Sequence, residues 1–326
     1  MTFSASAEKY LSRFWGRKWR IVIVLEDGSV LNDDGTTTAT GLDVSNLRVV
    51  GTIEDNIVSS YNPCELTIFN LNRDTEKLIL AQGKEIYVEL GYESPELYGS
   101  IYHGKIYQTH RSKANVTDYT LTLKALGSFD ILSEGVVSLS AKRGTNYREL
   151  LDIVAQSSTP SLEIDEVPEG WGEDRTFSRG VSLAGRTKNI LDEIATSTNS
   201  IIRIDDGKIN VIQLAQEPTE AIELNYNTGL VGQPVQDRNG VNFQTLINPQ
   251  IKLNSWVHIN NALINEASLE YGEMAIQPLD IDGLYRVISR QFQFDTRGNE
   301  WYINCKSITQ TGGTPDMLVE NATEGI

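Results

Sequence analysis

The sequence predicts a mainly β protein with a small α+β part, in which two antiparallel β-barrels flank a middle domain that contains helices. Three observations support this fold class. Residues 61–132 hold four segments of alternating polarity joined by short turns, as in an antiparallel meander. Residues 145–197 instead carry apolar side chains at helical spacing. From residue 224 onward the alternation typical of strands returns.

Length and composition are those of a globular chain with several domains. With 326 residues, of which 40% are hydrophobic, it can bury a large core and is expected to divide into two or three domains. We predict the following parts: an N-terminal arm (1–16), a first β-barrel (17–132), a middle α+β domain (133–218), a second β-barrel (219–309) and a C-terminal tail (310–326).

The chain is acidic, with a formal net charge of -16 and a sequence pI near 4.7. Proteins that bind nucleic acid through phosphate contacts normally carry the opposite balance, so we expect no tight nucleic-acid binding. The longest apolar run, Ile21–Leu25, is far too short for a membrane span, and the N-terminus has no apolar signal core. We therefore expect a soluble protein made in a reducing cytoplasm.

The first barrel is predicted from strands on both sides of a short helix. The strands are expected at Trp19–Leu25, Leu47–Ile53, Tyr61–Asn72, Lys84–Tyr92, Leu97–Tyr107 and Tyr119–Leu126. The helix precedes Gly83, which can close a helical turn. Gly99 and Gly104 interrupt one strand and indicate bulges or corners. Period-two alternation places these side chains in the core: Leu66, Ile68, Ile86, Val88, Leu121 and Leu123.

Two amphipathic helices define the middle domain. The first has Thr145 as its predicted cap, and the second covers residues 187–197. Between them, Ser161–Asp174 is acidic and contains Pro and Gly, so we predict an exposed loop around Trp171. Asp205–Lys208 then has the composition of a β-hairpin turn.

The second barrel is predicted from the strand patterns after residue 224. They are Gly232–Val235, Asn239–Ile251, which contains the turn Leu246-Ile-Asn-Pro249, and Trp256–Ile259. A closing hairpin follows, in which Gly283–Ser289 and Asn299–Ser307 pair across the turn Asp295–Gly298.

The order and spacing of these elements resemble those of phage tail baseplate hub proteins. In the first barrel the resemblance rests on the turn Phe69-Asn-Leu-Asn72, on the helix and Gly-Lys pair that follow, and on the strand with Ile101-Tyr-His-Gly-Lys-Ile106. Phe177–Leu183 resembles a segment of the small middle domain of that family, and Leu246–Pro249 resembles a turn of its second barrel. The resemblance extends from Trp19 to Thr309.

This resemblance implies a structural hub rather than an enzyme. It implies a homotrimer in which two tail-tube-like barrels per subunit form a pseudo-sixfold ring around the channel for genome passage. Such a ring connects the hexameric tail tube to the trimeric central spike of a contractile tail. The implied partners are a tail tube protein or tube initiator, the central spike protein, other baseplate proteins and the tape-measure protein. The implied location is the virion tail baseplate, after assembly in the host cytoplasm, with the spike as a separate chain.

The residues point to no catalytic, cofactor-binding or metal-binding site. Cys64 and Cys305 lie far apart in predicted strands and indicate buried free thiols. The histidines have no partner at metal-ligand spacing: His103, His110 and His258. The close acidic pair Asp280-Ile-Asp282 is interpreted as a solvated turn. Two alternatives stay open, namely a tail-associated cell-wall hydrolase or carbohydrate-binding protein, and a hub-like tail protein of a non-contractile phage.

Charged and aromatic segments add three further hypotheses. The basic cluster Arg13–Arg20 is either the solvated start of a strand or a site for an anionic partner. The aromatic side chains near the N-terminus, including Phe14 and Trp15, can dock on a neighbour. The following acidic loops are candidates to face a channel and give it an acidic wall: Glu26-Asp27, Glu54-Asp55 and Asp205-Asp206.

Overall fold

The structure is a computed structural model that describes residues 14–25, 41–57, 61–205, 207–213, 221–266 and 278–309. The chain divides into two compact units. The first unit comprises Met1–Asn56, Asn62–Leu126 and Pro218–Gly313, and the second comprises Ile57–Tyr61, Gly127–Glu217 and Thr314–Ile326. Three segments for which the sequence makes predictions, namely Glu26-Asp27, Arg13 and the C-terminal tail, lie outside the described residues.

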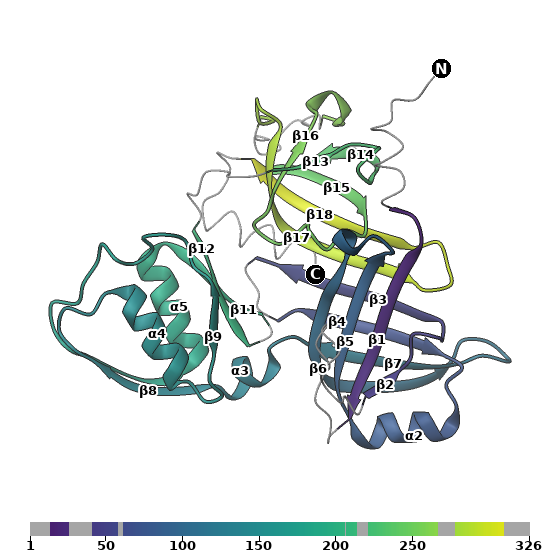
Figure 1. Ribbon diagram of the computed structural model, residues 1–326, viewed down its shortest axis with the longest axis horizontal. Helices are drawn as coiled ribbons and strands as arrows, with labels where there is room; N and C mark the ends of the chain where they lie inside the picture. Colours follow the sequence, from purple (N-terminus) through teal and green to yellow (C-terminus); the bar gives the residue numbers. More distant parts are fainter. Residues whose placement is uncertain are drawn as a thin grey trace, which may run out of the picture. The chain divides into compact units, whose positions relative to one another are not determined.

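The first unit is built almost wholly from strands (Figure 1). Its N-terminal elements are β1 (Arg17–Leu25), β2 (Gly41–Asp43), β3 (Val49–Asn56), β4 (Pro63–Phe69), α2 (Arg73–Gln82), β5 (Gly83–Tyr92), η2 (Pro95–Leu97), β6 (Tyr98–Lys113) and β7 (Tyr119–Leu126). Its C-terminal elements are β13 (Ala221–Leu224), β14 (Leu230–Gln236), β15 (Gly240–Leu246), β16 (Trp256–Ile259), η3 (Asn261–Leu263), β17 (Leu284–Asp295) and β18 (Trp301–Thr309).

Among the described residues these strands form one sheet of thirteen. The strand order is β14-β15-β18-β17-β3-β4-β7-β6-β5-β1-β2, and β13 and β16 pair with each other beside β17. The described strands form no closed ring of pairings. Strand β17 continues to Asp295, and its second part pairs with β3, so the sheet runs across the residues of both predicted barrels. Closure of each half into a barrel stays a prediction.

The two ends of this sheet repeat one topology. We call β3 to β7 the first half and β14 to β18 the second half. The order β3-β4-β7-β6-β5 in the first half has its counterpart in β14-β15-β18-β17-β16 in the second. Both long strands carry a bulge at the same point of the pairing, after Ile106 in β6 and after Val287 in β17. The halves differ in the strand that lies next to β5 and β16. Strand β1 pairs antiparallel with β5, whereas β13 pairs parallel with β16.

The predicted core of the first half is confirmed. All six side chains are buried, with no more than 2% of their surface exposed: Leu66, Ile68, Ile86, Val88, Leu121 and Leu123. Gly83 follows α2, and its amide donates to the carbonyl of Ile79. Gly99 and Gly104 lie on either side of a register shift between β5 and β6, as predicted. Any side chain at Gly104 would collide with the Tyr102 hydroxyl group, because a Cβ there would lie 2.3 Å from it.

The second unit packs two helices against short strands. Its elements are α3 (Phe129–Glu134), β8 (Val136–Ala141), α4 (Tyr147–Ser157), β9 (Glu163–Glu166), β10 (Val181–Arg186), α5 (Thr187–Thr198), β11 (Ser200–Asp205) and β12 (Lys208–Gln213). Strands β8 and β10 form one small sheet, and β11, β12 and β9 form another. Both predicted helices and the β11–β12 hairpin are present.

Two predictions for this unit are wrong in detail. The cap of α4 is Asn146, not Thr145, since the Asn146 side chain accepts the amide hydrogen of Glu149 at 2.7 Å. The segment predicted as an exposed loop contains β9, which pairs parallel with β12. Trp171 in that segment is only 4% exposed, because it packs into the core of the unit. A large apolar ring outweighs the polar composition around it.

Candidate functional site

One face of the large sheet is polar across six adjacent strands, from β15 to β7. Along these strands apolar and polar side chains alternate. The apolar side chains point into the core, and the polar side chains between them lie on the opposite face. We call this the polar face, and its described side chains include Asn242, Gln244, Asn304, Lys306, Gln291, Gln293, Thr52, Glu54, Glu65, Thr67, Thr122 and Lys124. Amide and hydroxyl groups predominate, so the face is hydrated and mostly uncharged.

Hydrogen bonds between side chains connect neighbouring strands along the polar face. The Gln244 amide donates to the Asn304 side chain at 2.8 Å, across β15 and β18. The Gln291 amide donates to the Glu54 carboxylate at 3.0 Å, across β17 and β3. Further along, the hydroxyl groups of Thr67 and Thr122 lie 3.0 Å apart. Such cross-strand pairs fix the side chains and stabilise the sheet register.

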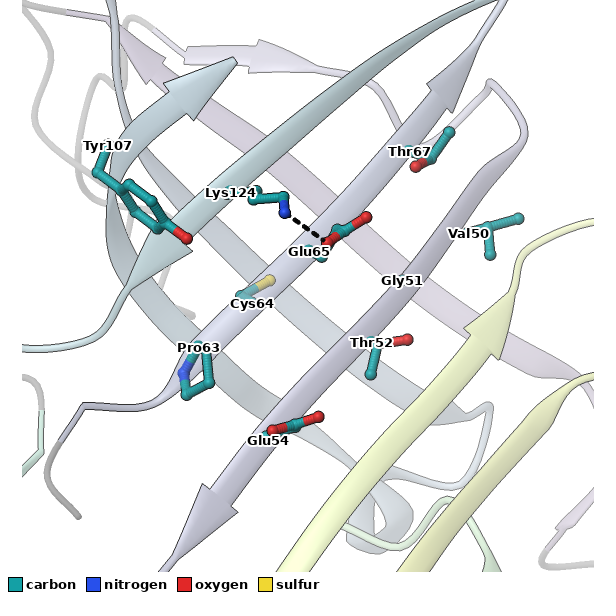
Figure 2. A pocket seen from close by; sticks show the side chains of 10 residues that line it. All are labelled: Val50, Gly51, Thr52, Glu54, Pro63, Cys64, Glu65, Thr67, Tyr107 and Lys124. Atoms are coloured by element: carbon teal, nitrogen blue, oxygen red, sulfur yellow. Dashed lines mark ion pairs between the residues drawn. The ribbon is translucent and has the colours of Figure 1, made fainter. Parts of the chain in front are cut away.

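A recess of about 480 Å³ lies on this face over β3, β4, β6 and β7 (Figure 2). Its lining residues are Val50, Gly51, Thr52, Glu54, Pro63, Cys64, Glu65, Thr67, Tyr107 and Lys124. The Lys124 ammonium group approaches the Glu65 carboxylate to 3.3 Å and neutralises it (Figure 2). The Tyr107 ring, which is 51% exposed, forms one wall. The recess is therefore a polar surface depression with one aromatic wall.

The thiols contribute no reactive group to this face. Cys64 and Cys305 are free and buried, as predicted. Burial raises the pKa of the Cys64 thiol far above its ordinary value and raises that of Cys305 to about 12. Since the thiolate is the nucleophile, both groups stay protonated and unreactive near neutral pH.

The histidines are dispersed, and two of them pair with single carboxylates. The His103 ring nitrogen Nε2 lies 3.1 Å from the Glu85 carboxylate, and this hydrogen bond lowers the pKa of Glu85. His258 pairs with Glu223 on the neighbouring strand, while His110 lies exposed on β6. Among the described residues no three His, Cys, Asp or Glu side chains gather as a metal site would require.

The remaining acidic candidates serve the fold rather than one common surface. Asp280 accepts the amide hydrogens of Asp282 and Leu284, which forms the predicted turn. Asp55 points into the core and pairs with Arg290, whereas its neighbour Glu54 lies on the polar face. In the second unit Asp205 pairs with the Arg203 guanidinium group at 2.8 Å, and Asp206 lies outside the described residues.

The described part of the basic cluster anchors β1. The Arg17 guanidinium group donates to the carbonyl of Gly298 at 2.8 Å and lies 5.4 Å from the Trp301 ring centre. Lys18 lies over the ring of Tyr98. These contacts favour the structural interpretation of the cluster over an anionic partner. Beside it, Phe14 packs against the core, whereas Trp15 is 78% exposed.

Sequence reasoning identified the alternating strands but missed the polar face as a continuous surface. The signal was present as Asn and Gln at alternate positions of β15, β17 and β18. It could not be assembled, because strand order depends on pairing between segments far apart in the sequence. A further finding is that no helix of the described residues is long and apolar enough to cross a membrane.

A sheet with a repeated strand order, one buried face and one polar face defines a β-rich fold, and solved structures share this fold. The 43 kDa tail protein of prophage MuSo2 from Shewanella oneidensis matches with a TM-score of 0.55 and 8% identity, over 90% of this chain and 99% of that one. A tail protein from Neisseria meningitidis MC58 matches with a TM-score of 0.52 and 11% identity, over 93% and 99%. A comparison with curated protein sequences found no match.

The particular family follows from the sequence itself. The family model for baseplate hub gp41 matches residues 36–303, which is most of the chain. The chain therefore belongs to the baseplate hub gp41 family, and the recognition made from its turns and strands is confirmed. It is a hub component of a phage tail baseplate by family, and that family is structural.

Proposed function

We propose that three copies of this chain form a pseudo-sixfold ring that connects a hexameric tail tube to a trimeric central spike. The observation that carries this proposal is the repeated strand topology of the first unit. A chain with two similar halves contributes two similar units to a ring, so three chains supply six. The same ring keeps true threefold symmetry for a trimeric spike. Closure of each half into a tail-tube-like barrel belongs to this proposal.

The polar face lines the channel of the ring in this proposal. Its amides and hydroxyl groups form hydrogen bonds across the strands, Glu65 is paired with Lys124, and the face also carries one further carboxylate, Glu54, and one further cation, Lys306. A hydrated wall with balanced charge offers no cluster of cations to hold phosphate groups. Genome passage and tape-measure passage both need such a surface, to which a moving polymer does not bind tightly.

The partners follow from this arrangement. The ring contacts the tail tube protein or tube initiator on one side and the central spike protein on the other. Other baseplate proteins and the tape-measure protein are further partners. The protein has no catalytic role and is a virion component assembled in the host cytoplasm. The five parts expected from the sequence serve as ring-forming barrels (17–132 and 219–309), a middle domain (133–218) and two terminal segments.

The native mass of the purified chain tests the proposal. We expect a mass of three chains by native mass spectrometry, and class averages from electron microscopy with a ring of six similar units. A chain that stays monomeric at every concentration, or that forms only even-numbered oligomers, contradicts the ring. Release of sugars from cell-wall polymer by the same preparation would favour the alternative of a tail-associated hydrolase.

A further inference from the structure

The two halves of the sheet are joined by one antiparallel pairing, in which Ser289–Asp295 of β17 lies against β3. We call this pairing the joint. On its core side the partly buried Arg290 guanidinium group contacts the buried Asp55 carboxylate at 2.8 Å. Phe292 and Phe294 of β17 are fully buried beside it. The joint begins directly after the bulge of β17, where the strand leaves β16 and gains β3 as its new neighbour.

The equivalent segment of the first half lies after the bulge of β6. We call this segment, Gln108–Lys113, the β6 edge. It pairs with β7 on one side, just as the segment of β17 pairs with β18. On its other side no described strand pairs with it, since β5 pairs only with the part of β6 up to Lys105. All six residues are exposed.

The β6 edge presents backbone donors to solvent. The amide of Ala114 donates to the carbonyl of Asp118, on the β7 side of the hairpin. Because amide directions alternate along an antiparallel ladder, the amides of Thr109, Arg111 and Lys113 point away from β7. An edge of this length with open donors is a template for an added strand.

The equivalent of β3 in the second half is β14, at the other end of the sheet. Among the backbone hydrogen bonds of the described residues, two join the outer side of β14 to Asn265: the Asn265 amide donates to the carbonyl of Pro234 at 2.8 Å, and the Gln236 amide donates to the carbonyl of Asn265 at 2.9 Å. Gly232 has open space where a side chain would begin. This edge therefore carries a two-bond bridge at the place where β3 carries a whole strand.

We propose that the β6 edge of one copy pairs antiparallel with β14 of a second copy and replaces the Asn265 bridge. The contact would repeat between copies the joint that each chain makes within itself, and thereby continue the sheet around the ring. This inference rests on the proposed function. Pairing of two β6 edges is disfavoured because it brings the cationic side chains of Arg111 and Lys113 from both copies together. Arg111 also contacts the Glu76 carboxylate of its own chain at 2.8 Å. The turn after β14 offers the carboxylate of Asp237 instead.

Thr109→Pro tests the pairing, because it removes one outward amide and leaves the bonds to β7 intact. Thr109→Val is the matched control, since it alters the side chain and keeps the amide. We expect the parent and Thr109→Val to have the mass of three chains, and Thr109→Pro to shift to single chains, measured by native mass spectrometry.

Hydrogen exchange on the parent protein gives a second readout that does not depend on any variant folding. The amides of Thr109, Arg111 and Lys113 should exchange slowly in the assembly and quickly in the dilute single chain. A trimeric parent with fast exchange at these amides and a trimeric Thr109→Pro variant overturns the pairing alone. A parent that never assembles contradicts the proposed ring as well, so the two failures are distinguishable.

Discussion

The second half of β17 and the β6 edge occupy the same place in two copies of one topology, yet their side chains differ. Counted from the two bulges, Phe294 in β17 corresponds to Lys113 in β6. Phe294 is fully buried against β3, whereas Lys113 is exposed and lies over the ring of Tyr119. Arg290 is held in an ion pair with the buried Asp55, while the corresponding Thr109 is exposed. The two halves thus share the order of strand pairing. The side chain is apolar at Phe294, where another strand of the same chain covers the segment, and polar at Lys113, where none of the described strands does.

The largest effect is expected from breaking the joint. Asp55→Ala leaves the Arg290 side chain, which is only 16% exposed, without its buried carboxylate partner, and this should lower the free energy of unfolding by about 3–5 kcal/mol. Urea unfolding followed by circular dichroism measures the loss. The control is Glu54→Ala on the polar face, which should change stability by only about 0.5 kcal/mol. Equal losses for the two variants would contradict the assigned role of the ion pair.

Substitutions at equivalent core positions of the two halves should lower the free energy of unfolding by similar amounts. Leu121 in β7 corresponds to Ile303 in β18, since both follow their hairpin turn by the same number of residues and both are buried. Leu121→Ala and Ile303→Ala should each cost about 2–5 kcal/mol, because each leaves a cavity in one continuous core. Thermal and urea unfolding check this. If one variant melts like the parent, the two halves do not share a cooperative core.

A smaller loss of stability is expected at Gly51, where the backbone of β3 lies against the Phe294 ring of β17. A Cβ at Gly51 would lie 2.3 Å from the Phe294 ring and 2.6 Å from Leu66, so Gly51→Ala overpacks the joint. We expect a loss of about 1–3 kcal/mol, by the same unfolding measurement. The double variant Gly51→Ala with Phe294→Leu should recover part of the loss, since the smaller side chain leaves room. Absence of any loss in the single variant would contradict the close approach at this position.

The pairing of β5 with β6 should add a pH dependence to the first half. The hydrogen bond from His103 lowers the pKa of Glu85 below its ordinary value of 4.5, so the bond contributes stability above that pH. The contribution is lost as pH falls through the lowered pKa of Glu85. Glu85→Gln should therefore flatten the stability profile below pH 4.5, measured by urea midpoints across that range. An unchanged profile would mean that the carboxylate contributes nothing through this bond.

The smallest expected signal is the binding of duplex DNA to the protein. The polar face has balanced charge and the chain carries a net charge of -16, so neither half offers a phosphate site. Fluorescence polarisation should detect no binding at moderate salt. Tight binding that weakens with added salt would contradict this expectation and would point to the basic cluster at Arg13–Arg20.

The sequence by itself determined the local elements and which side of each strand is buried. Alternation along β4, β5 and β7 identified all six core side chains, and the turns at Asn70 and Asn248 placed the ends of two equivalent strands. It did so because side-chain direction in a strand has a period of two and depends only on the order of residues. The same rule identified the thiols of Cys64 and Cys305 as buried.

Only the tertiary structure decided how the strands are joined. The pairing of Gly51 with Phe294, the bridge of Asn265 to β14 and the burial of Trp171 all connect segments far apart along the chain. Backbone donors and acceptors are the same in every residue except proline, so they do not encode which strand becomes the neighbour. That choice depends on bulges, on strand length and on the complete core, and it joined the strands of both predicted barrels in one sheet with an exposed edge.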